Sequence, residues 1–134
     1  MSESGVLKIS ELLYSVINDV SLTGIISGII YRESEPINNE LENVIILTTG
    51  LNSSYFRGVQ NGLANINIEI KSNSNGTPKI SRFETISNVI RTLLKNNNIH
   101  SKGLYFNIFS ENLFQEQKQN NTYYYNFKIN IQKL

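Results

Sequence analysis

Few side chains in this sequence are suited to catalysis or metal binding, and they are spread along the chain. There is no cysteine and one histidine, His100, which excludes a thiolate nucleophile, a disulfide and a zinc site built on cysteines or several histidines. His100 lies between an Asn-rich stretch and Ser101-Lys102-Gly103. A lone histidine in such a segment is typical of a solvated loop residue rather than of a general base.

The densest group of carboxylates is a set of four glutamates within ten residues: Glu33, Glu35, Glu40 and Glu42. Such a group is compatible with a hard-cation site or with an acid/base pair. A calcium loop needs Asp or Asn at fixed offsets around a glycine, and that spacing is missing here. We interpret the group as the charged end of a hairpin, and an enzyme that uses it stays as a weaker alternative.

Phosphate-binding and nucleophile motifs are also missing. Gly58-Val59-Gln60-Asn61-Gly62 contains two glycines, but no Lys-Ser/Thr pair follows and no helix is expected to begin there. A serine centred between glycines in a nucleophile elbow does not occur. We therefore predict that the chain is not an enzyme and has no catalytic, cofactor-binding or metal-binding residues.

The composition indicates one soluble domain over Met1–Leu134. A chain of 134 residues with a net charge of +1 is long enough to bury one core, and it has no broad charge that would attract nucleic acid or acidic membranes. No apolar run reaches the ~20 residues of a membrane span. Met1-Ser2-Glu3-Ser4-Gly5 lacks the features of a signal peptide, so we expect no membrane partner and retention in the compartment of synthesis.

In the first half of the chain we expect one helix and two strands before a long loop. Apolar residues recur with helical spacing from Val6 to Val20, and Thr23-Gly24 is expected to end this element, because Gly24 is able to take a positive φ. The β-branched run Ile25–Tyr31 and the segment Glu42–Thr49 predict strands. The segment Gly50–Gly62 has no clean period and predicts a loop.

In the second half, the pattern predicts a strand, a helix and a hairpin. Apolar residues alternate strictly from Ala64 to Lys71. A helical stripe runs from Ile80 to Leu94, opened either by Thr77-Pro78 or by a capping box from Ser81 to Glu84. The terminal hairpin pairs Leu104–Ile108 with Tyr123–Ile131 across the polar tip Gln115–Asn121.

These elements have the order α-β-β-β-α-β-β, which predicts an α+β fold. The connections are mostly of the antiparallel type, and both helices are amphipathic. We therefore expect a mostly antiparallel sheet with the two helices packed on one face.

The terminal hairpin raises the question of nucleic-acid binding. Tyr123 and Tyr125 share a face with Phe127 and belong to the expected core, whereas Tyr124 shares the opposite face with Lys128. An exposed aromatic beside a cation is the usual element of a base-stacking surface. A small module that binds single-stranded RNA or DNA is thus the alternative function.

The order of elements resembles that of the tail-terminator and tail-completion proteins of tailed bacteriophages. The parts that carry the resemblance are Ile9–Val20, the strand Asn65–Ile70, the helix Ser81–Leu94 and the hairpin Leu104–Ile131. Gly28-Ile29-Ile30-Tyr31 followed by Pro36 is similar as well. The resemblance covers most of the chain and rests on element order and size rather than on particular residues.

The resemblance implies a structural virion protein that closes the tail or joins it to the head. The expected partners are other copies of the chain in a homo-oligomeric ring, hexameric or else dodecameric, and neighbouring tail-tube or head-neck proteins. Genomic DNA at most passes through the ring, and the expected location is the virion, after assembly in the bacterial cytoplasm. A ring forms when a head-to-tail interface closes on itself.

Two sets of residues are candidates for the contacts of such a ring. The first is the loop triplet Tyr55, Phe56 and Arg57, for contact with a partner ring or the lumen; alternatively this is an ordinary loop whose Phe56 packs into the core. The second is the outward face of the terminal hairpin, which carries polar and aromatic side chains suited to contacts between subunits. Its candidate residues are Tyr105, Tyr124 and Lys128.

Overall fold

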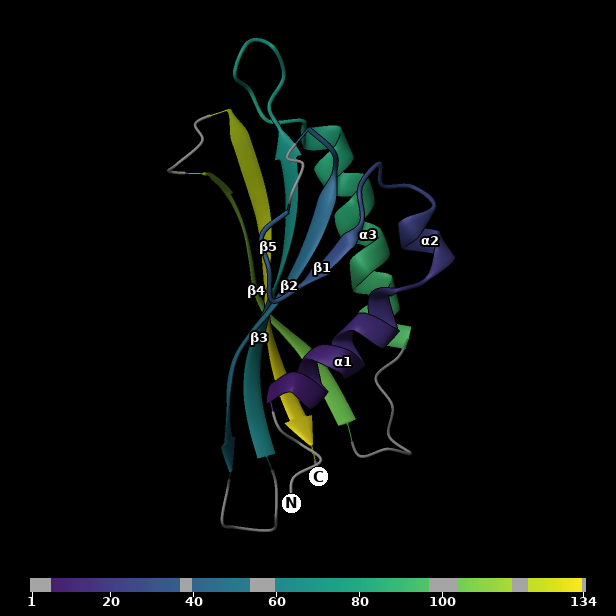
Figure 1. Ribbon diagram of the computed structural model, residues 1–134, viewed down its shortest axis with the longest axis vertical. Helices are drawn as coiled ribbons and strands as arrows, with labels where there is room; N and C mark the ends of the chain where they lie inside the picture. The colour runs from purple at the N-terminus through teal and green to yellow at the C-terminus, as the bar shows by residue number, and fades with distance from the viewer. Residues whose placement is uncertain (1–5, 37–39, 54–59, 97–103, 117–120, 134) are drawn as a thin grey trace.

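A computed structural model describes residues 6–36, 40–53, 60–96, 104–116 and 121–133. Its sheet has the strand order β1-β2-β3-β5-β4, and α1 and α3 lie against one face of that sheet (Figure 1). The α+β fold predicted from the sequence is confirmed. The elements are α1 (Val6–Ile17), α2 (Val20–Thr23), β1 (Ile30–Arg32), β2 (Asn43–Ser53), β3 (Gln60–Lys71), α3 (Ile80–Asn96), β4 (Leu104–Gln115) and β5 (Thr122–Lys133).

The core lies between the two long helices and the helix-facing side of the sheet. Both helices contribute one apolar stripe, and each central strand contributes every second residue, as an amphipathic helix and a half-buried strand should. Full burial of each such aliphatic side chain contributes about 1.5–3 kcal/mol. The fully buried members include Leu13, Ile17, Ile46, Ile66, Ile68, Ile86, Ile90, Leu94, Phe127, Ile129 and Ile131.

The first helix is shorter than predicted. It ends at Ile17 rather than at Val20, and a separate turn of helix follows as α2. Asp19 has extended backbone angles and its carboxylate accepts the Ser21 N–H at 2.9 Å, which is N-cap geometry and therefore starts a new helix. Gly24 caps the end of α2 with a φ of −77°, without using the positive φ that a glycine is able to take.

The first predicted strand is mostly wrong. Only Ile30–Arg32 forms β1, and this strand runs parallel to β2. The other three strand pairs are antiparallel, so the sheet is mostly antiparallel, as predicted. Residues before Ile30 instead make isolated hydrogen bonds to the start of β2: Gly28 N–H donates to the Glu42 backbone carbonyl, and Ile29 N–H lies 3.4 Å from Asn43 Oδ1. The β-branched composition of the segment indicated strand, but tertiary contacts decided its conformation.

The predicted loop Gly50–Gly62 is wrong at both ends. β2 continues to Ser53 and β3 begins at Gln60, with Gly50 opposite Leu63 and Ser53 opposite Gln60. A register shift lies between Thr48 and Gly50, and such a bulge breaks the alternation on which the prediction depended. The remaining residues of that loop, 54–59, lie outside the described part of the chain.

Neither predicted cap opens the second long helix. Thr77 belongs to the preceding turn, where its hydroxyl contacts Asn75 Oδ1 at 2.7 Å. Ser81 lies inside the helix, and its carbonyl accepts the Thr85 hydroxyl at 3.1 Å. The helix α3 begins at Ile80, after Pro78, because Asn and Thr side chains stabilise the turn in front of it.

The terminal hairpin is confirmed, with one irregularity. β4 and β5 pair antiparallel along their whole length, but a bulge separates Ile108 from Ser110 in β4. Before the bulge Ile108 lies opposite Ile129 on the core side, and after it Glu111 lies opposite Phe127 on that side. Phe109 is the extra residue, which explains why the alternation changes phase within the strand.

Candidate interaction surface

The strand β4 forms one edge of the sheet and is the most exposed apolar element of the described chain. It pairs with β5 on one side, and no strand among the described residues pairs with its other side. Three large apolar side chains of this strand are exposed, Phe109 at 70%, Leu113 at 38% and Phe114 at 45%. An open edge and exposed apolar side chains coincide here.

This edge has little of the protection that edge strands usually have. Natural edge strands are typically short or contain charges or proline, because an open edge pairs readily with other chains. β4 has 12 residues, contains no proline and has one charged residue, Glu111, which is engaged with Arg91. The bulge at Phe109 is the one protective feature. The strand therefore has the character of a surface that is covered in an assembly.

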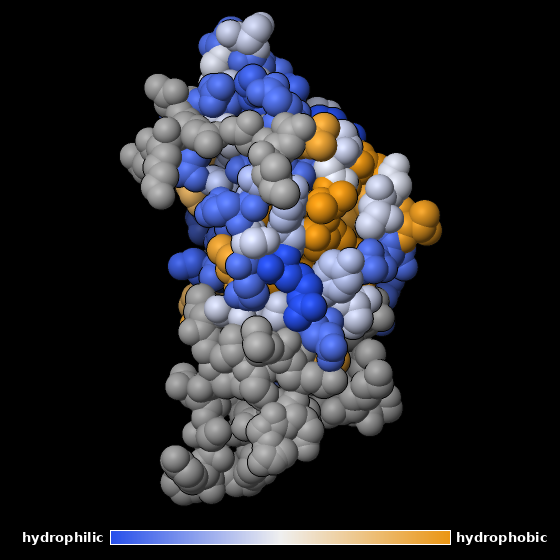
Figure 2. All heavy atoms as spheres, in the orientation of Figure 1, coloured by the Kyte–Doolittle hydropathy of each residue, from blue (hydrophilic) through white to orange (hydrophobic). Residues whose placement is uncertain are grey.

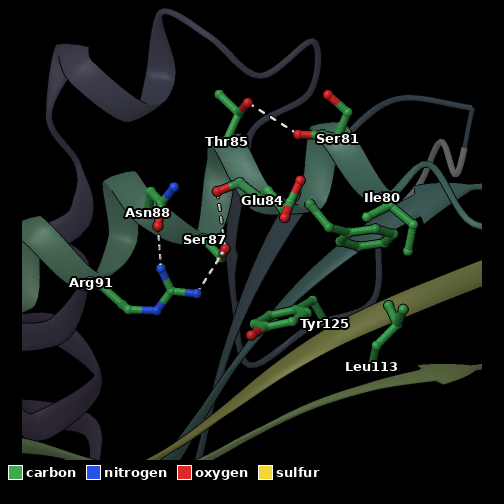
Figure 3. Close-up of a pocket in the computed structure, with 10 residues that line it drawn as sticks. Ile80, Ser81, Glu84, Thr85, Ser87, Asn88, Arg91, Leu113 and Tyr125 are labelled. Carbon is green, nitrogen blue, oxygen red and sulfur yellow. Dashed lines mark hydrogen bonds between the residues drawn. The ribbon is translucent and has the colours of Figure 1, made fainter.

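A groove of about 570 Å³ opens beside this edge, between α3 and the terminal hairpin. Figure 3 shows Ile80 at one end of α3 facing Leu113 and Tyr125 on the strands below it. Ser81, Glu84, Thr85 and Asn88 form the polar wall on the helix side. The groove thus has a mainly polar lining, with apolar side chains such as Leu113 and Ile80 at its β4 end.

Arg91 closes the inner end of the groove and ties α3 to β4. Its Nε and Nη2 donate to the Glu111 carboxylate at distances of 3.0–3.1 Å, Nη2 also donates to the Ser87 hydroxyl at 3.1 Å, and Nη1 contacts Asn88. Tyr125 donates its hydroxyl to Glu111 Oε1 at 2.6 Å. This bidentate geometry orients the edge strand relative to the helix.

The same contacts determine the charge of Glu111. Burial alone would raise the pKa of Glu111, but hydrogen bonds from Arg91 and Tyr125 outweigh it and lower the pKa. Burial, together with the hydrogen bond to Glu111, raises the pKa of Tyr125. Glu111 is therefore an ionised carboxylate that is paired with Arg91 and hydrogen-bonded to Tyr125.

The opposite edge of the sheet is closed by Glu33. This residue directly follows β1, and its N–H donates to the Ile46 carbonyl at 2.8 Å. Its carboxylate accepts the N–H and the hydroxyl of Thr48, both at 3.0 Å. Glu33 has a φ of +56°, a left-handed conformation that costs a non-glycine residue roughly 1–2 kcal/mol. These three hydrogen bonds hold that conformation and occupy the outer edge of β2 beyond β1.

Other exposed apolar residues lie on this second side of the molecule. Val20 begins α2, Ile29 precedes β1, and both are exposed. Figure 2 shows hydrophobic residues, coloured orange, in the region where α2 and β1 lie in Figure 1. The molecule therefore has exposed apolar side chains at both edges of the sheet, along β4 at one edge and near α2 and β1 at the other.

The sheet face opposite the helices has a buried polar centre. Glu69 on β3 is only 4% exposed, and it accepts the Tyr124 hydroxyl at 3.1 Å and lies 3.5 Å from Asn43 Nδ2. Burial raises the pKa of Glu69 and outweighs the hydrogen bonds from Tyr124 and Asn43, which lower it. The Tyr124 ring packs on Phe114, with 5.5 Å between ring centroids, which connects this centre to β4.

The residues predicted as interface positions have different environments. Tyr105 is half-buried in β4, Lys128 is exposed on β5, and Tyr124 is 7% exposed, with its hydroxyl on Glu69 and its ring against Phe114. The buried ring of Tyr124 is not presented for base stacking. Tyr55, Phe56 and Arg57 lie outside the described residues, as do His100 and Gly58.

The four carboxylates between Glu33 and Glu42 do not converge on one point. Glu33 binds Thr48, Glu40 pairs with Lys71 at 2.8 Å, and Glu42 pairs with Arg82 at 2.6 Å. The hydrogen bond from Arg82 lowers the pKa of Glu42. Within the described ranges, no three His, Cys, Asp or Glu residues form a group that could hold a metal ion. These glutamates anchor the connection between parallel strands, so their interpretation as a hairpin end is wrong.

The sequence prediction missed the apolar part of this surface. Phe109, Leu113 and Phe114 continue the strand beyond Ile108, but with shifted parity. A change of phase in an alternating pattern is a recognised sign of a bulge, and it was the available signal. The pairing of Arg91 with Glu111 had no signal in the sequence, because the two residues are distant along the chain.

Neither a protein-family model nor a curated protein matches the chain. No helix of the described residues has the length and apolarity needed to span a membrane.

Proposed function

We propose that this chain is a structural subunit that assembles with copies of itself, as a ring at the neck or tail end of a tailed bacteriophage. The observation that carries the self-assembly is the edge of β4, a 12-residue strand with exposed Phe109, Leu113 and Phe114 and no strand partner on its outer side in the described chain. The phage assignment is supported by the order of elements that the sequence predicted.

A second feature supports an assembly with more than one contact per subunit. A subunit of a closed ring, or of rings that stack on a tail tube, contacts neighbours on at least two surfaces. Exposed apolar side chains lie on both sides of the sheet, along β4 and near α2. The glutamates Glu33, Glu40, Glu42, Glu69 and Glu111 are engaged in internal contacts, which is in keeping with a structural rather than a catalytic role.

Size-exclusion chromatography with light scattering over a wide concentration range tests the proposal, with negative-stain imaging of the largest species. We expect hexameric or dodecameric rings, and binding to the tail-tube or neck proteins encoded beside this chain. A chain that stays monomeric at every concentration and binds none of those proteins would overturn the proposal. A salt-sensitive shift of labelled single-stranded oligonucleotides by the monomer would support the nucleic-acid alternative instead.

A further inference from the structure

The β1 edge and the β4 edge of the sheet differ in the backbone groups that they offer to a second copy of the chain. At the β1 edge, the strand has three residues, and Glu33 occupies the next carbonyl and N–H of β2, at Ile46 and Thr48. In a head-to-tail arrangement, β4 of one copy would have to pair with the β1 edge of the next copy. The β1 edge offers only three residues, and Glu33 occupies the β2 groups that lie beyond them, so the partner of β4 has to be found elsewhere.

A second β4 meets the requirements that the β1 edge does not. It has the same length, the same open side and the same apolar side chains, and a twofold axis brings two identical strands together antiparallel. We propose that the Glu111–Gln115 part of β4 pairs antiparallel with the same part of β4 in a second copy, about a twofold axis at Leu113. The two five-stranded sheets then form one continuous sheet. This inference rests on the proposed self-assembly and specifies one of its interfaces.

The position of the axis follows from the side chains after the bulge. An axis at Glu111 would place two carboxylates directly opposite each other, which is unfavourable. An axis at Leu113 places Leu113 opposite Leu113, Asn112 opposite Phe114 and Glu111 opposite the amide of Gln115. This register covers the exposed side chains of Leu113 and Phe114, on opposite faces of the strand, and brings no like charges together.

The groove beside β4 suits this arrangement. Leu113 lines the groove together with Ile80 of α3 and Tyr125 of β5. A strand added to the outer edge of β4 lies about 4.8 Å further out, so its Leu113 comes to lie beside the mouth of the groove. Phe114 of the second copy approaches on the other face, where Phe114 and Tyr124 already stack. The added strand thus meets apolar side chains on both faces.

A dimer of this kind constrains the ring that it builds. An isologous pair uses the same surface on both subunits, so ring closure needs a second, different contact. The exposed apolar residues Val20 and Ile29, near the β1 edge, are available for that contact. The resulting ring has dihedral symmetry and an even number of subunits.

A single introduced cysteine tests the twofold axis directly. The chain has no cysteine, so any disulfide of Leu113→Cys joins two copies. Opposed residues of an antiparallel pair have the Cα spacing that a disulfide needs. The full-length variant is oxidised at the concentration where the wild type assembles, and the dimer is followed on non-reducing gels. Thr92→Cys, at an exposed site on α3, is the matched control.

We expect Leu113→Cys to form a covalent dimer at least about tenfold faster than Thr92→Cys. A second measurement mixes Asn112→Cys with a size-tagged Phe114→Cys, for which the register predicts mainly the mixed dimer. Circular dichroism of the reduced variants establishes whether each is folded. If Leu113→Cys does not fold, the mixed pair of Asn112→Cys and Phe114→Cys still tests the proposed register.

The outcomes separate this inference from the proposed function. Rings that form without cross-linking at Leu113 or between Asn112 and Phe114 would overturn the β4 pairing and leave the proposed function standing. Rapid cross-linking in a chain that forms only dimers and binds no tail or neck protein would support the pairing and overturn the phage assignment. Equal cross-linking of Leu113→Cys and Thr92→Cys would indicate random collision and overturn the pairing.

Discussion

At the scale of single residues, the most unusual groups are buried or strained polar side chains that have structural partners. Glu69 is buried on the helix-free face beside Tyr124, and Glu33 holds a left-handed conformation by binding Thr48. Glu42 and Glu111 are each paired with an arginine. The pKa of Glu69 is raised and the pKa values of Glu42 and Glu111 are lowered, so the contributions of these three carboxylates to stability change in opposite directions with pH.

Replacing Glu69 by Gln should change how stability depends on pH. Burial raises the pKa of Glu69 in the folded chain, so its contribution is fully present below the ordinary glutamate pKa of about 4.3 and is lost as the pH rises through the folded value. We expect Glu69→Gln to remove this loss, so the variant gains stability relative to the wild type above about pH 4.3. Urea denaturation at a series of pH values measures the difference.

The lowered pKa values of Glu42 and Glu111 act in a separate window. Their contributions are present above the ordinary glutamate pKa and are lost as the pH falls through the lower folded values. The contributions of Glu42 and Glu111 are therefore present both in the wild type and in Glu69→Gln. Glu84→Gln, on an exposed position of α3, is the control and should follow the wild-type curve. Equal pH profiles for Glu69→Gln and wild type would show that Glu69 titrates as an ordinary glutamate.

At the scale of elements, the edge strand and the helix beside it act as one unit. Arg91 on α3 fixes Glu111 on β4, and the bulge at Phe109 changes which side chains of β4 face the helix. Leu113 consequently lines the groove while Phe114 lies with Tyr124 on the other face. The interaction surface is a property of this pair of elements and not of either alone.

A charge at Leu113 should weaken assembly without unfolding the chain. In Leu113→Lys, two ammonium groups face each other across the proposed axis, and charges on an open edge oppose strand pairing. We expect at least a tenfold weaker association, about 1.4 kcal/mol, by analytical ultracentrifugation. Thr92→Lys adds the same charge to an exposed site on α3 and should assemble as the wild type does. Unchanged assembly of a folded Leu113→Lys would argue against this edge.

At the scale of the whole molecule, the charges are few and mostly balanced. The net charge is +1, and charged residues make up 17% of the chain. The proposed contacts are apolar side chains and backbone hydrogen bonds along β4. Assembly by such contacts differs in its salt dependence from binding to nucleic acid.

Raising the salt concentration should therefore leave assembly unchanged or strengthen it. From about 50 mM to about 500 mM salt, exposed charges are increasingly screened, while contacts between apolar side chains persist. Light scattering at fixed protein concentration measures the average mass of the assembly. A fall to monomer over this range would show that ion pairs, rather than the β4 edge, hold the copies together.

The sequence by itself determined the parts of this protein that depend on periodicity. The stripes of α1 and α3, the alternation of β3 and β5 and the α+β class follow from side chains at regular spacing, because burying one face of an element requires that spacing. The same reasoning identified the terminal hairpin. It did not locate the ends of elements, since caps such as Asp19 act locally and compete with equally good alternatives.

Tertiary structure alone decided the features that depend on residues distant in sequence. β1 pairs parallel with β2, and Gly28 has no space for a Cβ because Asn43 Oδ1 and the Glu42 carbonyl lie against it. Arg91 meets Glu111, and Tyr124 is buried on Glu69, only when the strands take their places in the sheet. The open edge at β4 also depends on residues that are distant in sequence. Which strand is left without a neighbour depends on the strand order, and local sequence carries no record of that order.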